Sequence, residues 1–440
     1  MLKKVSWQDL LDRLRRRLAS WTLKPLNLPS RLILVKHVLQ AMPVYLFSLL
    51  SAPKSVLKDI RGIQRTFLWG GREEKSKFSL VSWDKICRPK MEGGLGLRDP
   101  ETLSGVFGSK IWWRWCTYSN EPWARLWHIK YARERPVEQL IRFNMERNGS
   151  HIWKKAWEGR LMVQSHCFWE IRSGEDANFW EDSWNQLSKL SSDPWWQTIW
   201  EIGVLDGRVK VKDYLEEAPR EGYKRWTDFS WANGRIGPEV IQAFSDTIQN
   251  RVIRATGGHD VLQWGHSQKG EFNIKEAYGL SNQWAMEQNT LWHQVWIANP
   301  WPKVAVFCWL VVWKKILTCE NLRVKDIICP SRCPLCYKVE ETMGHLLDSC
   351  DFLSTLWDKG ARVFRRSNRV RGHPELSIKE WDSKAFDNPI IQLIWRMFPG
   401  IILWHIWKER NNRIFRGISL ESMKVWRKIV INVQETVRSR

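Results

Sequence analysis

The residues best suited to chemistry lie close together in the sequence, between positions 333 and 350. Cys333, Cys336, His345 and Cys350 follow the spacing C-x2-C-x8-H-x4-C. Two cysteines on one tight turn, with a histidine and a cysteine from the following segment, can surround an ion tetrahedrally, and Zn²⁺ accepts thiolate and imidazole in that arrangement. Because both order and spacing fit, we favour a zinc site over four unrelated residues in a chain with nine cysteines.

Local structure is expected to hold these four residues together. Pro334 stiffens the turn between the first two cysteines, and residues 341–344 lead into a short helical run that carries His345 inward and ends at Cys350. Four protein ligands leave no open position for an activated water, so the one predicted zinc ion is structural. Cys329 is expected to be a bystander or a weak alternative ligand.

The residues around the predicted site resemble a known family. A pattern of C-P-L-C, E-T, H-L-L, C and L-W runs from Cys333 to Trp357, after V-W, P-K-V, F-C-W-L and E-N-L motifs that begin at Val295. This pattern is similar to the zinc-binding domain that follows reverse transcriptase in plant non-LTR retrotransposons. Three further motifs, RTFLWGG at 65–71, VSWD at 81–84 and GGLGL at 93–97, resemble the segment that lies between the polymerase and the zinc-binding domain in that family.

The resemblance implies a position just after a polymerase palm. Residues 28–47 would then correspond to a thumb-like element beside a template–primer duplex, whereas the residues themselves indicate only a basic helical bundle. Reverse transcriptases hold two metal ions with a Tyr-x-Asp-Asp carboxylate pair, and this chain contains no Asp-Asp dipeptide. A ribonuclease H domain would begin at about Arg440, where the chain stops. We therefore expect no enzymatic activity and assign no catalytic residue.

Charge indicates the class of partner. The 440 residues include 69 Lys and Arg against 47 Asp and Glu, a formal net charge of +22. Such a surplus favours a polyanion, and nucleic acid is the commonest one. RNA or single-stranded DNA is therefore the predicted partner, a protein partner is an alternative, and no small-molecule substrate is expected. Charge alone leaves open a basic surface without any ligand.

Two basic segments are candidates for contact with phosphate. The first is the polar face of an amphipathic helix predicted at 6–21, and the second is an exposed loop predicted after Trp357. A solvated face and a solvated linker are the alternatives. The candidate nucleic-acid-binding residues are Arg13, Arg16 and Arg17 on the helix, and Arg362, Arg365, Arg366 and Arg369 in the loop.

Tryptophans offer a second kind of contact, since bases stack on aromatic rings. The chain has 32 of them, and between residues 110 and 135 they alternate with lysines and arginines. However, Trp112 and Trp115, and likewise Trp123 and Trp127, are spaced as neighbours on one helix face. That spacing favours packing in the core over base stacking.

The predicted fold is mainly α with small β-hairpins (α+β). Strand patterns at 168–172 and 178–180 flank one Gly/Asp turn, and those at 261–264 and 271–274 flank another, so each pair is expected to form a hairpin. The remaining strong patterns are helical and lie at 31–42, 53–69, 275–284, 291–322 and 420–437.

The most apolar run lies at 389–407. Gln392 and Arg396 interrupt it, so it is predicted to form a buried helix pair broken at Pro399-Gly400 and not a membrane span. An odd number of scattered cysteines and a start without an apolar h-region indicate a reducing intracellular compartment, nuclear or cytoplasmic, and no secretion.

Four parts are predicted: a helical thumb- or connection-like region at 1–140, a mixed hairpin and helix connector at 141–285, a reverse transcriptase-type zinc-binding domain at 286–360, and a basic linker with C-terminal helices at 361–440. Our hypothesis is a non-catalytic, zinc-stabilised fragment of a retrotransposon polyprotein that binds RNA or single-stranded DNA through basic surfaces. The alternatives are a structural or protein-interaction module, and the product of a degenerate element with no retained activity.

Overall fold

The computed structural model is mainly helical with a few short strands, which confirms the predicted fold class. It describes residues 7–22, 24–70, 78–118, 120–133, 146–184, 209–217, 223–226, 253–254, 258–265, 269–282, 290–299, 301–366 and 386–438, with single positions at 239, 242, 246, 248, 374 and 378. These residues form two compact units. The first contains Val44–Lys54 and Glu101–Gln283, and the second contains Trp7–Pro43, Ser55–Pro100 and Trp284–Arg440.

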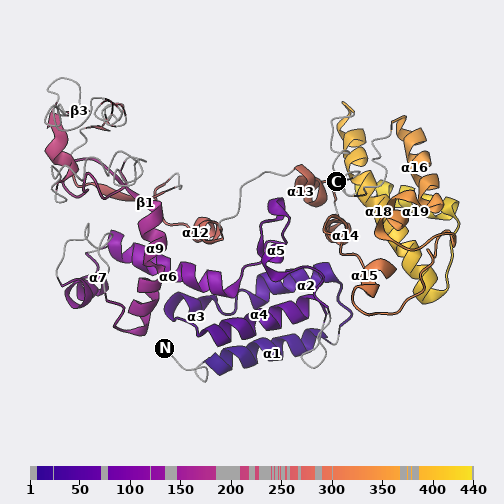
Figure 1. The fold of residues 1–440 in the computed structure, drawn as a ribbon, viewed down its shortest axis with the longest axis horizontal. Coiled ribbons are helices and arrows are strands. Elements are labelled where there is room, and N and C mark those ends of the chain that lie inside the picture. The colour runs from indigo at the N-terminus through magenta and orange to yellow at the C-terminus, as the bar shows by residue number, and fades with distance from the viewer. Residues whose placement is uncertain are drawn as a thin grey trace. The chain divides into compact units, whose positions relative to one another are not determined.

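The second unit begins with amphipathic helices that lie side by side (Figure 1). They are α1 (Gln8–Thr22), α2 (Leu28–Leu34), its π-helical continuation η2 (Val35–Leu39), and α4 (Lys54–Leu68). In α1, Leu10, Leu11 and Leu14 are buried and the arginines of the opposite face are exposed, as the helical period predicts. Trp21 of α1 packs against Phe67 of α4, with ring centroids 5.8 Å apart.

The ends of these helices follow local chemistry. The helix predicted at 31–42 begins earlier, at Leu28, because the Asn27 side chain accepts a hydrogen bond from Ser30 N at 3.0 Å. Helix α4 ends near the predicted position, where Gly70 has a left-handed φ of 74°. The guanidinium of Arg31 occupies the space that a side chain at this glycine would need.

A turn at Gly93 joins the N-terminal helices to the helix before the zinc segment. The carbonyl of Gly93 accepts hydrogen bonds from the indole Nε1 of Trp309, at 2.7 Å, and of Trp313, at 2.9 Å. The donors of one buried and one half-buried indole are thereby satisfied by one backbone group. The elements at this junction are α5 (Trp83–Cys87), the 3₁₀-helix η3 (Lys90–Glu92), α13 (Thr290–His293), the π-helix η8 (Gln294–Ala298) and α14 (Pro302–Val312).

Tryptophans form the core of the first unit. Trp112 and Trp115 are 0% and 1% exposed, and both contact Trp153, at centroid distances of 5.8 and 5.3 Å. Tyr131 stacks on Trp153 at 4.0 Å. The packing of Trp112 and Trp115 in a core confirms the prediction for this pair, whereas Trp123 and Trp127 are half-buried. The helices that supply these rings are α6 (Pro100–Thr117), α7 (Pro122–Trp127), η4 (His128–Ala132) and α9 (His151–His166), and α3 (Val44–Leu49) belongs to the same unit.

The strands pair differently from the prediction, and both expected local hairpins are wrong. β1 (Cys167–Glu170) pairs antiparallel with β5 (Val261–Trp264), with Cys167 opposite Trp264. The reason lies in Asp260, whose carboxylate accepts five backbone N–H bonds from residues 172–177, at 2.7–3.4 Å. The loop after β1 therefore wraps around Asp260 instead of returning as a strand. A second antiparallel sheet has the order β2 (Leu215–Glu217), β3 (Tyr223–Trp226), β4 (Ile253–Arg254), and the 3₁₀-helix η6 (Val211–Tyr214) precedes it.

The apolar run near the C-terminus forms one helix, α18 (Pro389–Arg416), so the predicted break at Pro399-Gly400 is wrong. A proline inside a helix costs about 3 kcal/mol, but burial of one large apolar side chain contributes roughly 1.5–3 kcal/mol. Ile401, Ile402 and Leu403, directly after Pro399, are all buried, which offsets the lost hydrogen bond. Among the described residues, α18 alone is long and apolar enough to cross a membrane, yet 61% of its most apolar window is buried inside the protein.

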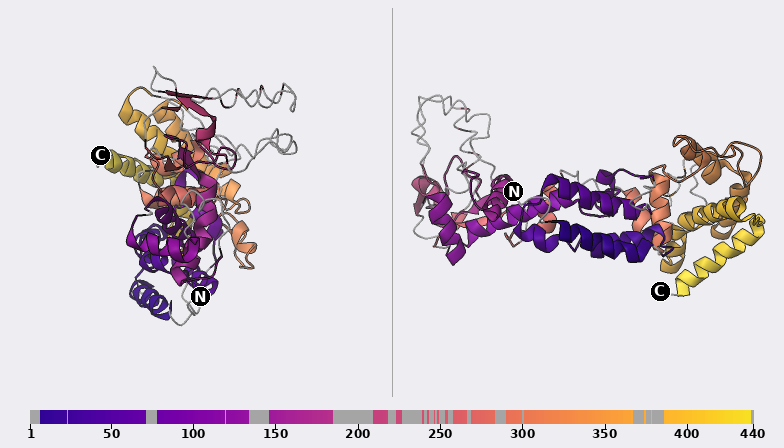
Figure 2. Two further views of the ribbon diagram at one scale, coloured as in Figure 1. Left: turned by 90° about the vertical axis from the view of Figure 1, so that its left-hand side faces the viewer. Right: turned by 90° about the horizontal axis from the view of Figure 1, so that it is seen from below.

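The remaining elements of the second unit surround α18. Helix α19 runs back alongside it, at the yellow end of the chain in Figures 1 and 2. Val425 and Ile429 are buried on this helix, and Val430 and Val433 are only partly covered. The elements are α15 (Cys319–Arg323), the π-helix η9 (His345–Ser349), α16 (Asp351–Phe364) and α19 (Ser422–Arg438). In the first unit, α12 (Ile274–Ser281) begins one residue before the helix predicted at 275–284 and ends three residues before its predicted end.

Candidate metal centre

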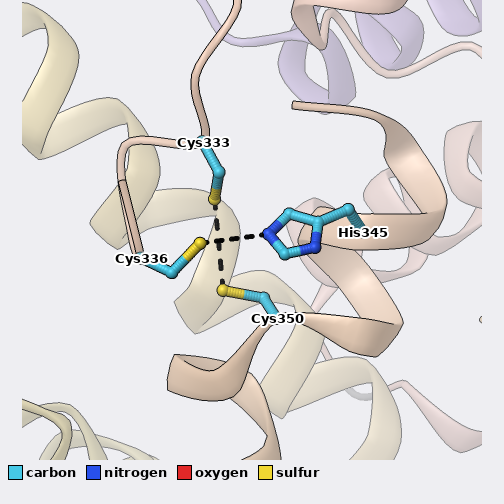
Figure 3. A group of neighbouring side chains, drawn as sticks. All are labelled: Cys333, Cys336, His345 and Cys350. Carbon is cyan, nitrogen blue, oxygen red and sulfur yellow. Dashed lines mark hydrogen bonds between the residues drawn. The ribbon is translucent and has the colours of Figure 1, made fainter. Parts of the chain in front are cut away.

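The four residues predicted to bind zinc lie around one point (Figure 3). Their ligand atoms all lie within 4.8 Å of one another. Cys333 Sγ and Cys350 Sγ are 4.0 Å apart, and Cys336 Sγ lies 3.3 Å from His345 Nε2. Tetrahedral coordination with Zn–S bonds of about 2.3 Å would separate two sulfurs by about 3.8 Å. The donor set and its dimensions therefore fit one zinc ion.

A tight hairpin presents the first two cysteines. Cys333 N donates to Val339 O at 2.8 Å, and Tyr337 N donates to Cys333 O at 2.9 Å. Tyr337 has a left-handed φ of 59°, which reverses the chain directly after Cys336. Cys329 lies outside the group of ligands, and its thiol donates to the Cys319 carbonyl at 3.7 Å.

A π-helical turn brings the other two ligands together. Cys350 N donates to His345 O at 2.9 Å, which is the five-residue spacing of a π-helix. The sequence spacing H-x4-C therefore corresponds to one wide turn with a ligand at each end. Thr342 Oγ1 accepts from His345 N at 3.0 Å, and Leu346 and Leu347 anchor the turn in the core. The helical run predicted here is present, in the π form.

Hydrogen bonds set the protonation of His345 and of two of the cysteines in a way that favours binding of a cation. Ser349 Oγ lies 3.4 Å from His345 Nδ1, so a proton on Nδ1 leaves the lone pair of Nε2 facing Cys336. A hydrogen bond from the Cys350 thiol lowers the pKa of Cys333 to about 5, and the same bond raises the pKa of Cys350. The two sulfurs thus share one proton, which a divalent cation would displace on binding.

A buried ion pair connects the zinc segment to α18. Arg410 donates to Glu341 Oε1 from both Nε, at 3.0 Å, and Nη2, at 2.8 Å. Only 3% of the arginine side chain and 1% of the glutamate side chain are exposed. Glu341 also accepts from Cys319 N at 3.4 Å, and its own N donates to Ser331 O at 2.7 Å. The pair therefore joins α15, the base of the cysteine hairpin and α18.

A second arginine of α18 holds the cysteine turn itself. Arg413 Nη1 donates to the carbonyls of Pro334 and Leu335, each at 3.0 Å, between the two cysteine ligands. Its Nε donates to Glu409 at 2.9 Å, and Nη2 donates to Leu420 O at 2.9 Å. Sequence reasoning missed both arginines, because nothing within the 333–350 motif points to residues about seventy positions away.

The candidate nucleic-acid-binding residues lie on different elements. Arg13, Arg16 and Arg17 are exposed on α1, where Arg13 pairs with Asp9 at 3.1 Å. No contact in the described part of the chain assigns a ligand to them.

The second basic segment is only partly a loop. Arg362 lies within α16, so the loop predicted there is wrong, because the amphipathic pattern of α16 continues to Phe364. Arg365 follows with a left-handed φ of 54°, and the exposed Arg366 lies over the Phe386 ring at 5.1 Å. Arg369 is outside the described residues.

Comparison with known proteins agrees with this site. Residues 272–357 match the family model described as zinc-binding in reverse transcriptase. The matched residues include all four ligands of the cluster. The match ends before α18, which supplies Arg410 and Arg413.

Two plant proteins are similar to the chain over longer or different stretches. One, from Arabidopsis thaliana, is provisionally named a ribonuclease H protein and is 28% identical over 424 residues, which cover 94% of this chain and 65% of the relative. The other, an uncharacterized mitochondrial protein of Arabidopsis thaliana, is 27% identical over 145 residues, 33% of this chain and 92% of the relative. The chain thus spans just under two thirds of the first relative's length. These matches confirm the resemblance to reverse transcriptase-like proteins of plant retrotransposons with a zinc-binding domain.

Proposed function

Starting from a chain that carries a reverse transcriptase-type zinc-binding domain, we propose that it binds RNA or single-stranded DNA as a non-catalytic part of a retroelement protein. The observation that carries the proposal is the combination of this domain with a net charge of +22. Zinc would stabilise the fold, because four protein ligands leave no site for an activated water. The basic surface would supply the contacts to phosphate.

The proposal includes the absence of polymerase and ribonuclease H activity from this chain. Its support is the lack of an Asp-Asp dipeptide in the sequence. A Cys₃His site needs reduced thiols, so the proposed compartment is reducing and intracellular, either nuclear or cytoplasmic.

Binding should be measured with the zinc-loaded chain and a labelled single-stranded RNA, a single-stranded DNA of the same sequence, and the corresponding duplex. We expect sequence-tolerant binding to the single strands, with log K falling linearly with log salt at about −0.7 per phosphate contact. Reversing the charges of Arg13, Arg16 and Arg17 tests α1 as one contributing surface. Failure to bind any of the nucleic acids at low salt would refute the proposal.

A protein partner is the second candidate, and one observation favours it. Val324, Ile328 and Tyr337, in the segments just before and within the cysteine hairpin, are 82%, 98% and 62% exposed. Large apolar side chains at this exposure can serve a protein interface. A complex that forms only with a protein, and never with nucleic acid, would favour this function instead.

A further inference from the structure

Three lysines from three helices of the second unit converge beside the contact between α18 and α19. That contact is a hydrogen bond between His405 and Asn432, with 2.6 Å between Nε2 and Nδ2. Lys408 follows His405 by one turn of α18, and Lys428 precedes Asn432 by one turn of α19, so each lysine lies one turn from this hydrogen bond. Both lie close enough to His405 for their charges to act on its ring.

The third lysine reaches this place from α14. Phe307 of α14 packs on Trp404 of α18, with ring centroids 5.4 Å apart. Lys303 lies one turn before Phe307, and Lys408 lies one turn after Trp404 with its Nζ 6.0 Å from the centre of that ring. Lys303 Nζ lies 4.9 Å from the centre of the Trp301 ring. Two half-buried indoles therefore lie beside the lysines.

The three positive charges are close enough to repel one another. Burial, together with repulsion from Lys303 and Lys428, lowers the pKa of Lys408. Burial and the same three lysines lower the pKa of His405 to about 3, so that ring stays neutral and adds no charge. None of the three lysines forms an ion pair with a carboxylate in the described part of the chain. Three uncompensated cations at one place favour an anion as ligand.

We propose that Lys303, Lys408 and Lys428 form a phosphate-contact site for single-stranded nucleic acid, with the indoles of Trp301 and Trp404 available to stack bases. This inference rests on the proposed function and names the surface that performs it. A single strand of nucleic acid fits this site better than a free phosphate ion does, because cations and aromatic rings alternate here as they do on proteins that bind single-stranded nucleic acid. None of these lysines belongs to the basic segments singled out in the sequence.

The test compares two variants of the full zinc-loaded chain with equal loss of charge. One is K303Q/K408Q/K428Q, and the control is K54Q/K58Q/K275Q, which removes three exposed lysines elsewhere. Loss of three contacts should lower the salt slope on single-stranded RNA by about 2 and weaken binding at low salt by roughly tenfold or more. The control and a K303R/K408R/K428R variant should bind like the unmodified chain.

Each outcome decides the inference. If the unmodified chain binds and both glutamine variants bind equally well, the site is refuted while the proposed function stands; if the unmodified chain does not bind, the proposed function fails. Zinc content and helicity check folding. If replacing the half-buried Lys408 unfolds the chain, K303Q/K428Q carries the same test, with an expected slope change of about 1.4.

Protection of lysines from chemical acetylation distinguishes binding of a nucleic-acid strand from binding of a free phosphate ion. Bound RNA should protect Lys303 and Lys428 from the reagent, and inorganic phosphate alone should not. Equal protection by phosphate alone would overturn the proposal in favour of a small-anion site.

Discussion

Arg413 of α18 donates hydrogen bonds to the carbonyls of both residues between Cys333 and Cys336, Pro334 and Leu335, at 3.0 Å each. Both bonds come from Nη1, while Nε and Nη2 hold the guanidinium against Glu409 and Leu420. This charged donor fixes the two peptide planes and with them the direction of the flanking thiols. The metal centre therefore depends on a helix that lies outside both the motif and the matched residues 272–357.

Replacing Arg413 should weaken zinc retention without removing a ligand. Hydrogen bonds to a charged group contribute roughly 1.5–3 kcal/mol each, so R413A should release zinc to a competing chelator markedly faster than the unmodified chain. R413K keeps the charge but loses the fork, and should fall between the two. Equal release rates for all three would show that the turn is rigid without α18.

The ligand set predicts a clear contrast between neighbouring cysteines. Cys336→Ser should lower zinc content and expose the 329–351 segment to protease, because structural zinc contributes on the order of 10 kcal/mol to folding such a segment. Cys329→Ser should keep a full zinc content, since Cys329 lies outside the cluster. Elemental analysis reads out both. Full zinc in Cys336→Ser, or none in the unmodified chain, would contradict the assignment.

The buried pair of Arg410 and Glu341 should show strong coupling. Removal of either partner leaves an uncompensated buried charge, so R410M and E341Q should each lower the free energy of unfolding, by about 3–5 kcal/mol for an unpaired charge. The double variant should lose much less than the sum of the two. Additive losses in chemical denaturation would mean that the two side chains do not act as a pair.

Lys155 should make the stability of the first unit depend on pH. It is 2% exposed, its Nζ donates to Leu50 O and Ser104 Oγ, and burial lowers its pKa from 10.5 to about 7. Between pH 7 and 9 the unfolded chain holds this proton and the folded chain does not, so the free energy of unfolding should rise with pH. The expected increase in the free energy of unfolding is about 1.4 kcal/mol per pH unit. K155M should abolish this slope; an unchanged slope would refute the assignment.

Catalytic assays should be negative. The purified chain should neither extend a primed template nor cleave the RNA of an RNA–DNA hybrid, because the sequence lacks the Asp-Asp pair that polymerases use to hold metal ions. The measurement is nucleotide incorporation and hybrid cleavage with Mg²⁺ or Mn²⁺, against a heat-inactivated sample. Template-dependent incorporation above that background would disprove the expectation.

Local features of this protein could be read from the sequence, and distant ones could not. The spacing of Cys333, Cys336, His345 and Cys350 predicted the cluster, because a hairpin and one helical turn fix their distances locally. The helical spacing of Trp112 and Trp115 likewise indicated a core.

By contrast, β1 pairs with β5 across more than ninety residues, and only the carboxylate of Asp260 explains why the nearer partner is not used. Pro399 was expected to break α18, but burial on both sides of it outweighs the lost bond. The two arginines that hold the zinc segment belong to α18, and only the folded chain brings that helix beside the cysteine hairpin.

The unbroken course of α18 has a consequence for insertions and deletions. Each residue added to or removed from an α-helix rotates everything beyond it by about 100°. A single insertion between Pro399 and Arg410 would therefore turn Arg410 and Arg413 away from Glu341 and the cysteine turn together, although every ligand would remain in the sequence. In related chains that carry such an insertion, the register of this helix and tight zinc binding should be lost together, even where C-x2-C-x8-H-x4-C persists.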